Sequence, residues 1–100
     1  MDVSRRAHIA RALRALAPQL PAHEFEAVLD HALDSAGLKA ALPESAAWLS
    51  LVAYARHVFT DYDDLLNEGY DHASARFFVA KKLLETLREW GVRRPLAPED

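Results

Sequence analysis

The sequence predicts a single all-α domain over residues 1–91, a compact bundle of four longer helices and one short helix, followed by a frayed tail over residues 92–100. Three observations predict this class. Alanine, the residue with the highest helix propensity, supplies nineteen of the 100 residues. Only three glycines and five prolines interrupt the chain. Apolar residues also recur at spacings of three and four, the period of an amphipathic helix.

The first two helices are delimited by prolines and a glycine. We expect the first over residues 3–17, with Asp2 or Ser4 as its N-cap and Pro18 ending it. The second is expected over residues 21–37, because proline suits the first turn of a helix and glycine its end. Each has one apolar and one polar face, so each is expected to pack one side against a core.

The third expected helix, PESAAWLSLVAYARHVF, covers residues 43–59 and again opens with proline. From Ala46 to Ala55 its only polar residue is Ser50. A helix that is apolar on nearly all sides needs neighbours on all sides. The sequence therefore predicts that this helix lies in the middle of the bundle.

Capping residues mark the last two helices. Thr60 and Asp63 form a variant of the capping box, which opens a short fourth helix that ends at Gly69. Asp71 is the expected N-cap of the fifth and longest helix, over residues 72–90. This pattern predicts a helix-turn-helix arrangement at the end of the chain.

The fifth helix carries a charged residue on its apolar face. Arg76 falls in the middle of that face and needs an acceptor if it is buried, so we expect an ion pair with Asp63. Phe78 falls on the charged face and is expected to be exposed. The apolar face comprises Ala73, Phe77, Val79, Ala80, Leu83, Leu84, Leu87 and Trp90.

Composition excludes several classes of function. The chain has no cysteine, which excludes disulfides and thiolate chemistry. Its N-terminal residues lack the apolar segment and cleavage site of a signal peptide, and no run approaches the about 18 apolar residues of a membrane span. We expect a cytoplasmic protein without membrane contact. The net charge of −3 gives no overall attraction to nucleic acid.

Histidines and aspartates crowd into the segment RHVFTDYDDLLNEGYDH, residues 56–72. The candidate functional residues are His57, Tyr62, Asp61 and Asp64. A metal-dependent enzyme built on His57 and the nearby aspartates is one hypothesis. However, the spacing matches no metal motif, and acids in a first turn complement the helix dipole. We therefore expect no metal and no cofactor, and we rank an enzyme third.

Nucleic-acid binding is the second hypothesis. The fourth and fifth helices resemble a helix-turn-helix in outline, but the acidic Asp71 at the start of the second of them would repel phosphate. Basic residues lie near the two ends of the chain and form one patch only if the termini meet in space. The candidates are Arg5, Arg6, Arg11 and Arg14 near one end and Arg93 and Arg94 near the other.

A non-enzymatic binding or protein-interaction module is the leading hypothesis. Phe78 is the candidate interface residue, because it stands among charged residues. The fifth helix is about 28 Å long at about 1.5 Å per residue, so it can extend beyond a domain of this size and pack against a copy of itself. We therefore expect a protein partner or self-association as a homodimer.

A further pattern runs from Arg56 to Trp90. It reads Arg-His, Thr, Tyr-Asp, Leu-Leu, Gly, Ala-Arg and a closing Trp, at Arg56, His57, Thr60, Tyr62, Asp63, Leu65, Leu66, Gly69, Ala75, Arg76 and Trp90. This pattern resembles the bacterial domain-of-unknown-function family numbered 2293. In the first half of the chain GLKAALP stands where that family has a loop containing glycine and arginine. The resemblance implies a helical domain of bacterial origin and carries no mechanism.

Overall fold

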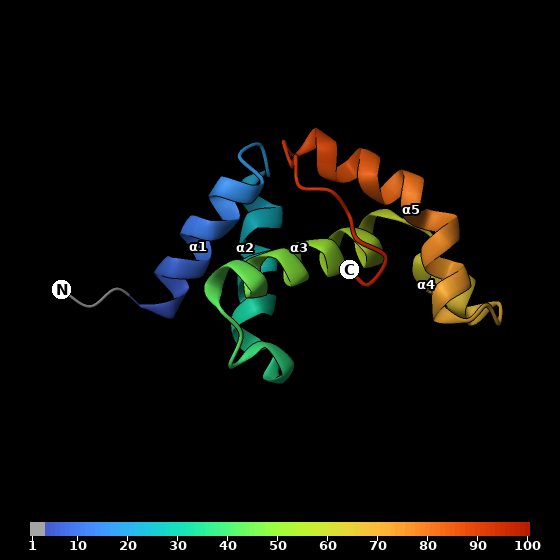
Figure 1. Cartoon of the computed structure of the whole chain (residues 1–100), viewed down its shortest axis with the longest axis horizontal. Coiled ribbons are helices and arrows are strands. Elements are labelled where there is room, and N and C mark those ends of the chain that lie inside the picture. Colours follow the sequence, from blue (N-terminus) through green and yellow to red (C-terminus); the bar gives the residue numbers. More distant parts are fainter. Residues whose placement is uncertain (1–3) are drawn as a thin grey trace.

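The computed structural model describes residues 4–100. Within that range the chain forms five α-helices, a short 3₁₀ turn and no strand, which confirms the all-α class (Figure 1). The expected cap at Asp2 and the expected helix start at residue 3 lie outside the described residues. The helices are α1 (Arg5–Leu16), α2 (Ala22–Asp34), α3 (Pro43–Phe59), α4 (Tyr62–Asn67) and α5 (His72–Glu89), and the 3₁₀ turn η1 is Ala36–Leu38.

Two predicted N-caps are present. The hydroxyl of Ser4 accepts the backbone N–H of Ala7 at 3.1 Å, which caps α1. The carboxylate of Asp71 accepts the N–H of Ser74 at 2.7 Å, which caps α5. Each side chain satisfies a backbone donor that has no partner inside its helix.

The boundaries of α2 differ slightly from the prediction. Pro21 is the N-cap of α2 and not its first helical residue. The helix ends at Asp34, before the expected Gly37, because Ser35 has an extended backbone with φ of −71° and ψ of 117°. Gly37 instead lies inside η1. The chain between α2 and α3 is therefore a compact turn that replaces the last turn of the predicted helix.

Glycines end α4 and α5 with the same hydrogen-bond pattern. Gly69 and Gly91 have φ values of +104° and +84°, a conformation that is strained for residues with a Cβ. The next residue in each case, Tyr70 and Val92, donates its N–H to the carbonyl five residues earlier, at 3.1 and 3.0 Å. This is the Schellman motif, and in both places it redirects the chain out of the helix.

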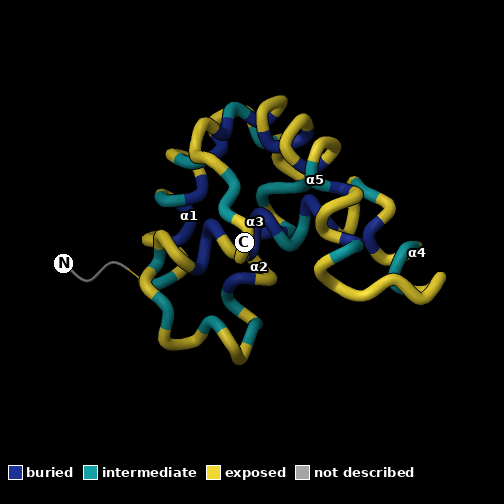
Figure 2. The backbone as a smooth tube through the Cα atoms, turned by 45° about the vertical axis from the view of Figure 1, so that its right-hand side comes forward, coloured by how far each residue is buried: buried dark blue, intermediate teal, exposed yellow. Residues whose placement is uncertain are grey.

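α3 lies in the middle of the fold, as its composition predicted. It contacts every other α-helix of the described chain, and Trp48, Leu51 and Ala55 along its length are 1% exposed or less. Figure 2 shows the buried stretches gathered where α3 meets α1, α2 and α5. Each large apolar side chain buried there contributes about 1.5–3 kcal/mol. The neighbours supply Ile9, Leu13, Val28, Leu29, Leu83 and Leu87.

A second, smaller core lies at the α4 end. It contains Tyr62, Ala75 and Val79, with Leu65 and Leu66 partly buried against it. This cluster joins α4 to the first half of α5 and is separate from the main core. Figure 1 shows α4 at one end of the molecule, which extends 50 Å along its long axis against 28 and 23 Å across. The first half of α5 therefore has few neighbours.

The C-terminal segment is packed, contrary to the frayed tail expected over residues 92–100. Val92 is 1% exposed and belongs to the main core, and Leu96 is partly buried against that core. The guanidinium of Arg94 lies 4.4 Å from the ring of a tryptophan in α3. The turn at Gly91 explains this path, because it directs the chain back along the bundle (Figure 1).

We predict that Gly91→Ala destabilises the protein more than Gly69→Ala. Both alanines must adopt a left-handed conformation, which costs about 1–2 kcal/mol. A Cβ at Gly91 would also lie 3.0 Å from Cγ of Pro18, whereas a Cβ at Gly69 would meet nothing within 4 Å. Urea unfolding of the two variants and the parent measures the difference. Equal midpoints for the two variants would contradict the role given to the contact with Pro18.

We predict that the cap of α5 makes stability depend on pH in the acid range. Hydrogen bonds from the backbone and then the hydroxyl of Ser74, followed by the nearby charge of His72, lower the pKa of Asp71. A carboxyl whose folded pKa lies below the unfolded value of about 3.9 adds stability above that pH, and this is lost as pH falls through the folded pKa. Urea midpoints of the parent and Asp71→Asn should therefore converge between about pH 5 and about pH 2. A difference that stays constant across this range would count against the charged cap.

Candidate functional site

Tyr62 is the centre of the predicted site, and it is buried. The residue is only 4% exposed. The ring of His57 meets its ring edge-on at a centroid distance of 5.3 Å, and the guanidinium of Arg56 lies 5.6 Å from its centroid. The Tyr62 hydroxyl lies 2.8 Å from Nδ1 of His72. Tyr62 therefore fastens α4 to α3 and α5, a structural role that the sequence did not reveal.

His57 is a surface residue that contacts Asp63. Its Nδ1 lies 2.6 Å from Oδ1 of Asp63, and the two side chains are 50% and 56% exposed. A pair this accessible to water contributes at most about 1 kcal/mol. The short turn between α3 and α4 brings the two residues together. Sequence reasoning assigned Asp63 to a capping box with Thr60, to the helix dipole and to Arg76. It grouped His57 with the nearby aspartates without naming which of them it contacts.

Asp61 and Asp64 lie exposed at the start of α4. Within residues 4–100 their carboxylates make no hydrogen bond or ion pair, and no group of three His, Asp or Glu side chains is placed to hold a metal ion. The candidates are thus one buried residue, Tyr62, and three exposed ones, so Tyr62 does not face solvent together with the other three.

The buried arginine at this end of the molecule is Arg56, and the prediction that it is Arg76 is wrong. Arg56 is 8% exposed. Arg76 is exposed and, in the part of the chain that the structure describes, forms no ion pair with Asp63, which contacts His57 instead. The physical reason is the incomplete covering of α5. Only its second half packs on the main core, so the first half leaves Arg76 in water.

Arg56 is held by a backbone oxygen. One of its terminal nitrogens donates to the backbone oxygen of Asp100, and its Nε is buried without an acceptor in the described chain. Burial, followed by the like charge of Arg76, lowers the pKa of Arg56. Both side chains nevertheless stay charged at neutral pH, because arginine does not deprotonate in proteins. The positively charged guanidinium groups of Arg56 and Arg76 therefore lie close enough to repel each other.

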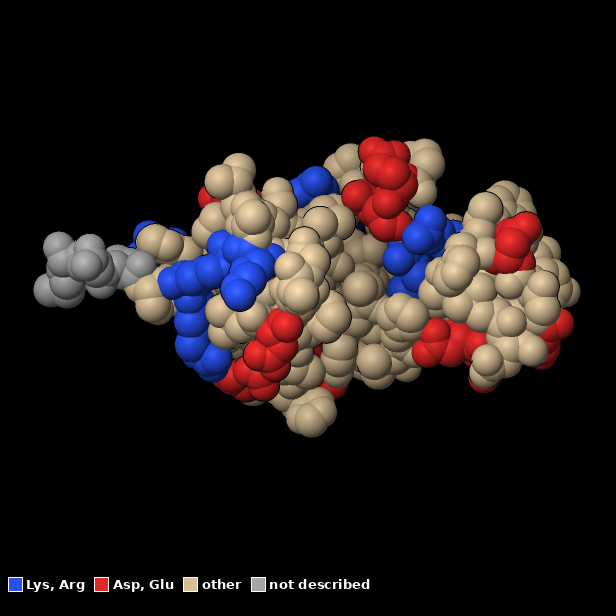
Figure 3. All heavy atoms as spheres, turned by 90° about the horizontal axis from the view of Figure 1, so that it is seen from below, with Lys and Arg blue, Asp and Glu red and all other residues tan. Residues whose placement is uncertain are grey.

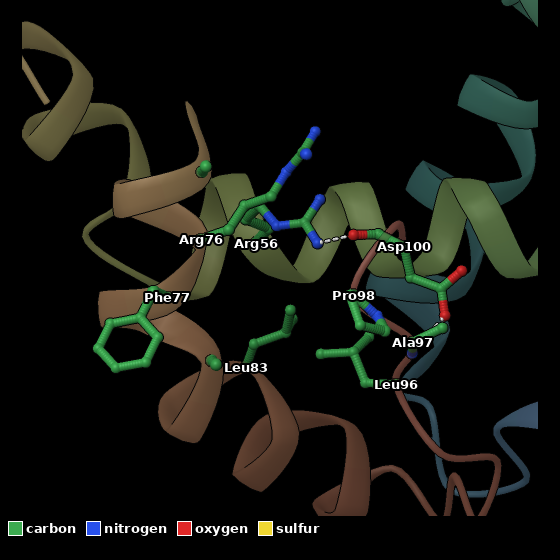
Figure 4. Close-up of a pocket in the computed structure, with 10 residues that line it drawn as sticks. Arg56, Arg76, Phe77, Leu83, Leu96, Ala97, Pro98 and Asp100 are labelled. Carbon is green, nitrogen blue, oxygen red and sulfur yellow. Dashed lines mark hydrogen bonds between the residues drawn. The ribbon is translucent and has the colours of Figure 1, made fainter. Parts of the chain in front are cut away.

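These two arginines lie in a groove between α5 and the C-terminal segment, which we call the arginine groove (Figure 4). The groove has a volume of about 420 Å³. Apart from Arg56, Arg76 and Asp100 its lining is apolar. Most of the lining residues come from α5 and from the C-terminal segment. The lining residues are Arg56, Ala73, Arg76, Phe77, Ala80, Leu83, Leu96, Ala97, Pro98 and Asp100.

Sequence reasoning missed the arginine groove because it treated the tail as frayed. One signal was available. A glycine that ends a helix is commonly followed by an apolar residue that packs back on the helix, and Gly91 is followed by Val92. Applied to Gly91, this rule places the tail against the bundle and so beside Arg56.

The N-terminal arginines are largely engaged within the fold. Arg5 donates to two backbone carbonyls of the segment before α3, both at 2.8 Å. Arg6 contacts two acids of α2 at 3.0 and 3.7 Å, and Arg14 lies 4.9 Å from the ring of Phe25. Arg11 is exposed. Figure 3 shows one basic cluster beside acidic side chains at the α1 end and another near the middle of the molecule.

Comparison with known families gives one match. A family model described as "Uncharacterized conserved protein (DUF2293)" matches residues 12–91. This range extends from within α1 to the turn at Gly91, and it includes both arginines of the groove. No curated protein and no solved structure matches the chain. Within residues 4–100, none of the helices combines the length and apolar character that a membrane span requires.

We predict that Arg76→Ala changes the free energy of unfolding by less than about 0.5 kcal/mol, because the side chain is exposed. Arg56→Ala should cost about 1–3 kcal/mol, since it leaves the backbone oxygen of Asp100 without its donor and removes buried packing. Chemical unfolding of both variants provides the comparison. A loss of several kcal/mol in Arg76→Ala would reinstate a buried ion pair for that residue.

Proposed function

We propose that this chain, which belongs to the family of uncharacterised conserved proteins DUF2293, is a non-enzymatic protein-interaction module that pairs with a second copy of itself. The observation that carries this proposal is a cluster of three exposed aromatic side chains at the α4 end. The cluster contains Tyr70, Phe77 and Phe78, and we call it the aromatic edge.

The rings of the aromatic edge contact one another in water. Tyr70, Phe77 and Phe78 are 43%, 79% and 58% exposed. The ring centroids of Tyr70 and Phe78 lie 5.4 Å apart, and those of Phe77 and Phe78 lie 5.8 Å apart, both edge-to-face. Single exposed apolar residues are ordinary, but contiguous ones mark interaction surfaces. The exposure of Phe78 agrees with the sequence, whereas the placement of Phe77 on the buried face was wrong.

Protein partners suit this surface better than small ligands do. Aromatic side chains are enriched at the centres of protein interfaces, because they offer large contact areas and lose few rotatable bonds on binding. Burial of a phenylalanine contributes about 1.5–3 kcal/mol, and folding of this chain leaves two adjacent phenylalanines largely unburied. Association recovers that contribution.

The charges on α5 favour a second copy as the partner. The exposed residues Lys81 and Lys82 are followed by two exposed acids, Glu85 one turn on and Glu89 two turns on. Two α5 helices that approach in antiparallel orientation bring the lysines of each copy toward the glutamates of the other. A two-fold interface also needs only one patch, since both copies present the same surface.

Nucleic-acid binding has less support in the arrangement of charges. The basic side chains seen in Figure 3 form separate clusters that lie beside acidic side chains. The N-cap of α5, at the start of the would-be recognition helix, is the exposed carboxylate of Asp71. A carboxylate at that position repels phosphate groups.

We predict that the parent protein dimerises and that the double variant Phe77→Ser/Phe78→Ser weakens the dimer by at least about tenfold, because hot-spot aromatics carry most of the binding energy of an interface. Sedimentation equilibrium over a range of concentrations measures this. The matched control is Leu42→Ser, which changes an equally exposed apolar residue, 70% accessible, outside the aromatic edge. It should dimerise like the parent.

Two results would contradict self-association through the aromatic edge. One is a parent protein that stays strictly monomeric at the highest concentration reached. The other is a dimer that the double variant leaves intact. Unfolding midpoints of all three proteins accompany the measurement. We expect the double variant to match the parent because its substituted side chains are exposed. We expect Leu42→Ser to be at least as stable as the parent because residue 42 is the N-cap of α3, where serine is favoured.

A further inference from the structure

We propose that the arginine groove binds an acidic peptide segment, with a carboxylate of the peptide held jointly by Arg56 and Arg76 and a neighbouring apolar side chain of the peptide lying against α5. This proposal goes beyond self-association. It concerns an adjoining surface that shares only Phe77 with the aromatic edge, and other substitutions test it.

The two arginines reach the groove from different helices. Figure 4 shows Arg56 leaving α3 and Arg76 leaving α5, with the guanidinium of Arg56 against Asp100 and that of Arg76 beyond it, farther from the apolar side chains. A guanidinium presents five N–H donors in a planar fork, which matches the two oxygens of a carboxylate. Arg56 is 8% exposed, so its packing fixes the direction of the fork. Arg76 is exposed and free to close on a ligand.

The hydrogen-bonding capacity of the pair is not used up inside the chain. One N–H of Arg56 meets the backbone oxygen of Asp100, but its Nε is buried without an acceptor in the described residues. An unsatisfied buried donor is unfavourable, as is the repulsion between two like charges. A bound carboxylate offsets the repulsion between the two charges.

Asp100 is an acid that lines the groove, and its side-chain carboxylate is occupied elsewhere. Its side-chain oxygen Oδ2 accepts the backbone N–H of Ala97 at 2.8 Å, which closes a turn of the tail. Its charge acts on Arg56 less strongly than that of Arg76 does. The groove therefore keeps an excess of positive charge at its closed end.

The apolar lining selects a peptide over a simple anion. Ala73, Phe77, Ala80 and Leu83 form the α5 wall, and none of them offers a hydrogen bond to an ion through its side chain. A ligand that fills the groove needs an apolar part next to its negative charge. A peptide with an apolar residue a few positions before an Asp, a Glu or a terminal carboxylate has this form.

The chain contains such a segment, LAPED at residues 96–100, and it lies along the groove. Leu96 and Ala97 line the apolar part, and the backbone oxygen of Asp100 accepts from Arg56. The segment thus shows the contacts that a peptide from a partner would make. The tail is one wall of the groove, so a partner peptide lies between the tail and α5.

Titration of the full chain with a synthetic peptide tests the proposal. The probe is N-acetylated LAPED with a free carboxylate, and the neutral counterpart is N-acetylated LAPQN amide. Binding is followed by NMR through the Nε–H signals of Arg56 and Arg76. Inorganic phosphate serves as a third probe, because it carries charge without an apolar part.

We expect the acidic peptide to shift both arginine signals and the neutral peptide to shift neither. Arg76→Gln should weaken binding by about tenfold or more, the scale of a lost charge-assisted hydrogen bond. Arg93→Gln, which removes an exposed arginine outside the groove, is the matched control and should bind like the parent. Asp100→Asn should strengthen binding, since it removes a negative charge from the wall of the groove.

Three results would overturn the proposal. If acidic and neutral peptides bind equally, the arginines do not recognise a carboxylate. If phosphate binds as tightly as the peptide and displaces it, the groove is a site for simple anions. If no probe shifts the arginine signals, Arg56 only fastens the tail. Because Arg76 is exposed, its variant should fold, and a thermal unfolding curve for each variant verifies this.

Discussion

The burial of α3 is the constraint on which the rest of the structure depends. A helix with almost no polar face must be covered on all sides, and α1, α2, the second half of α5 and Val92 do this for most of its length. The covering ends near Ala55, and Arg56 is the next residue. Its aliphatic part remains packed while its charged end reaches the surface. The position of the arginine groove follows from the place where the cover of α3 stops.

The two halves of α5 differ for the same reason. Its second half contributes Leu83 and Leu87 to the main core, whereas its first half packs on α4 through a cluster of three buried residues. Because the first half of α5 has fewer neighbours, both charged and aromatic side chains there remain exposed to solvent, among them Arg76, Phe77 and Phe78. The aromatic edge and the arginine groove meet there, because Phe77 belongs to both. Regions with small cores open more readily than the rest of a fold, and binding surfaces are often located in them.

Local chemistry made much of the fold predictable. The bounds of α3, the caps at Ser4 and Asp71 and the turns at Gly69 and Gly91 could be identified from single residues, because proline, glycine and small polar residues act on the backbone beside them. The candidate site was far less predictable. A helical projection assumes that a helix is covered evenly, and this assumption placed the exposed Arg76 in the core. Contacts such as His57 with Asp63 depend on the angle between two helices, which no residue spacing reveals.

The path of the tail decides where a reporter can be attached. The backbone oxygen of Asp100 lies against Arg56, so a fluorophore attached to the tail near this residue would lie beside the groove and crowd any ligand there. The beginning of α1 lies at the other end of the molecule, away from both the groove and the aromatic edge (Figure 1). Immobilisation through the beginning of α1 leaves both surfaces accessible. A fluorescent label on the tail would instead report whether the tail stays packed beside the groove.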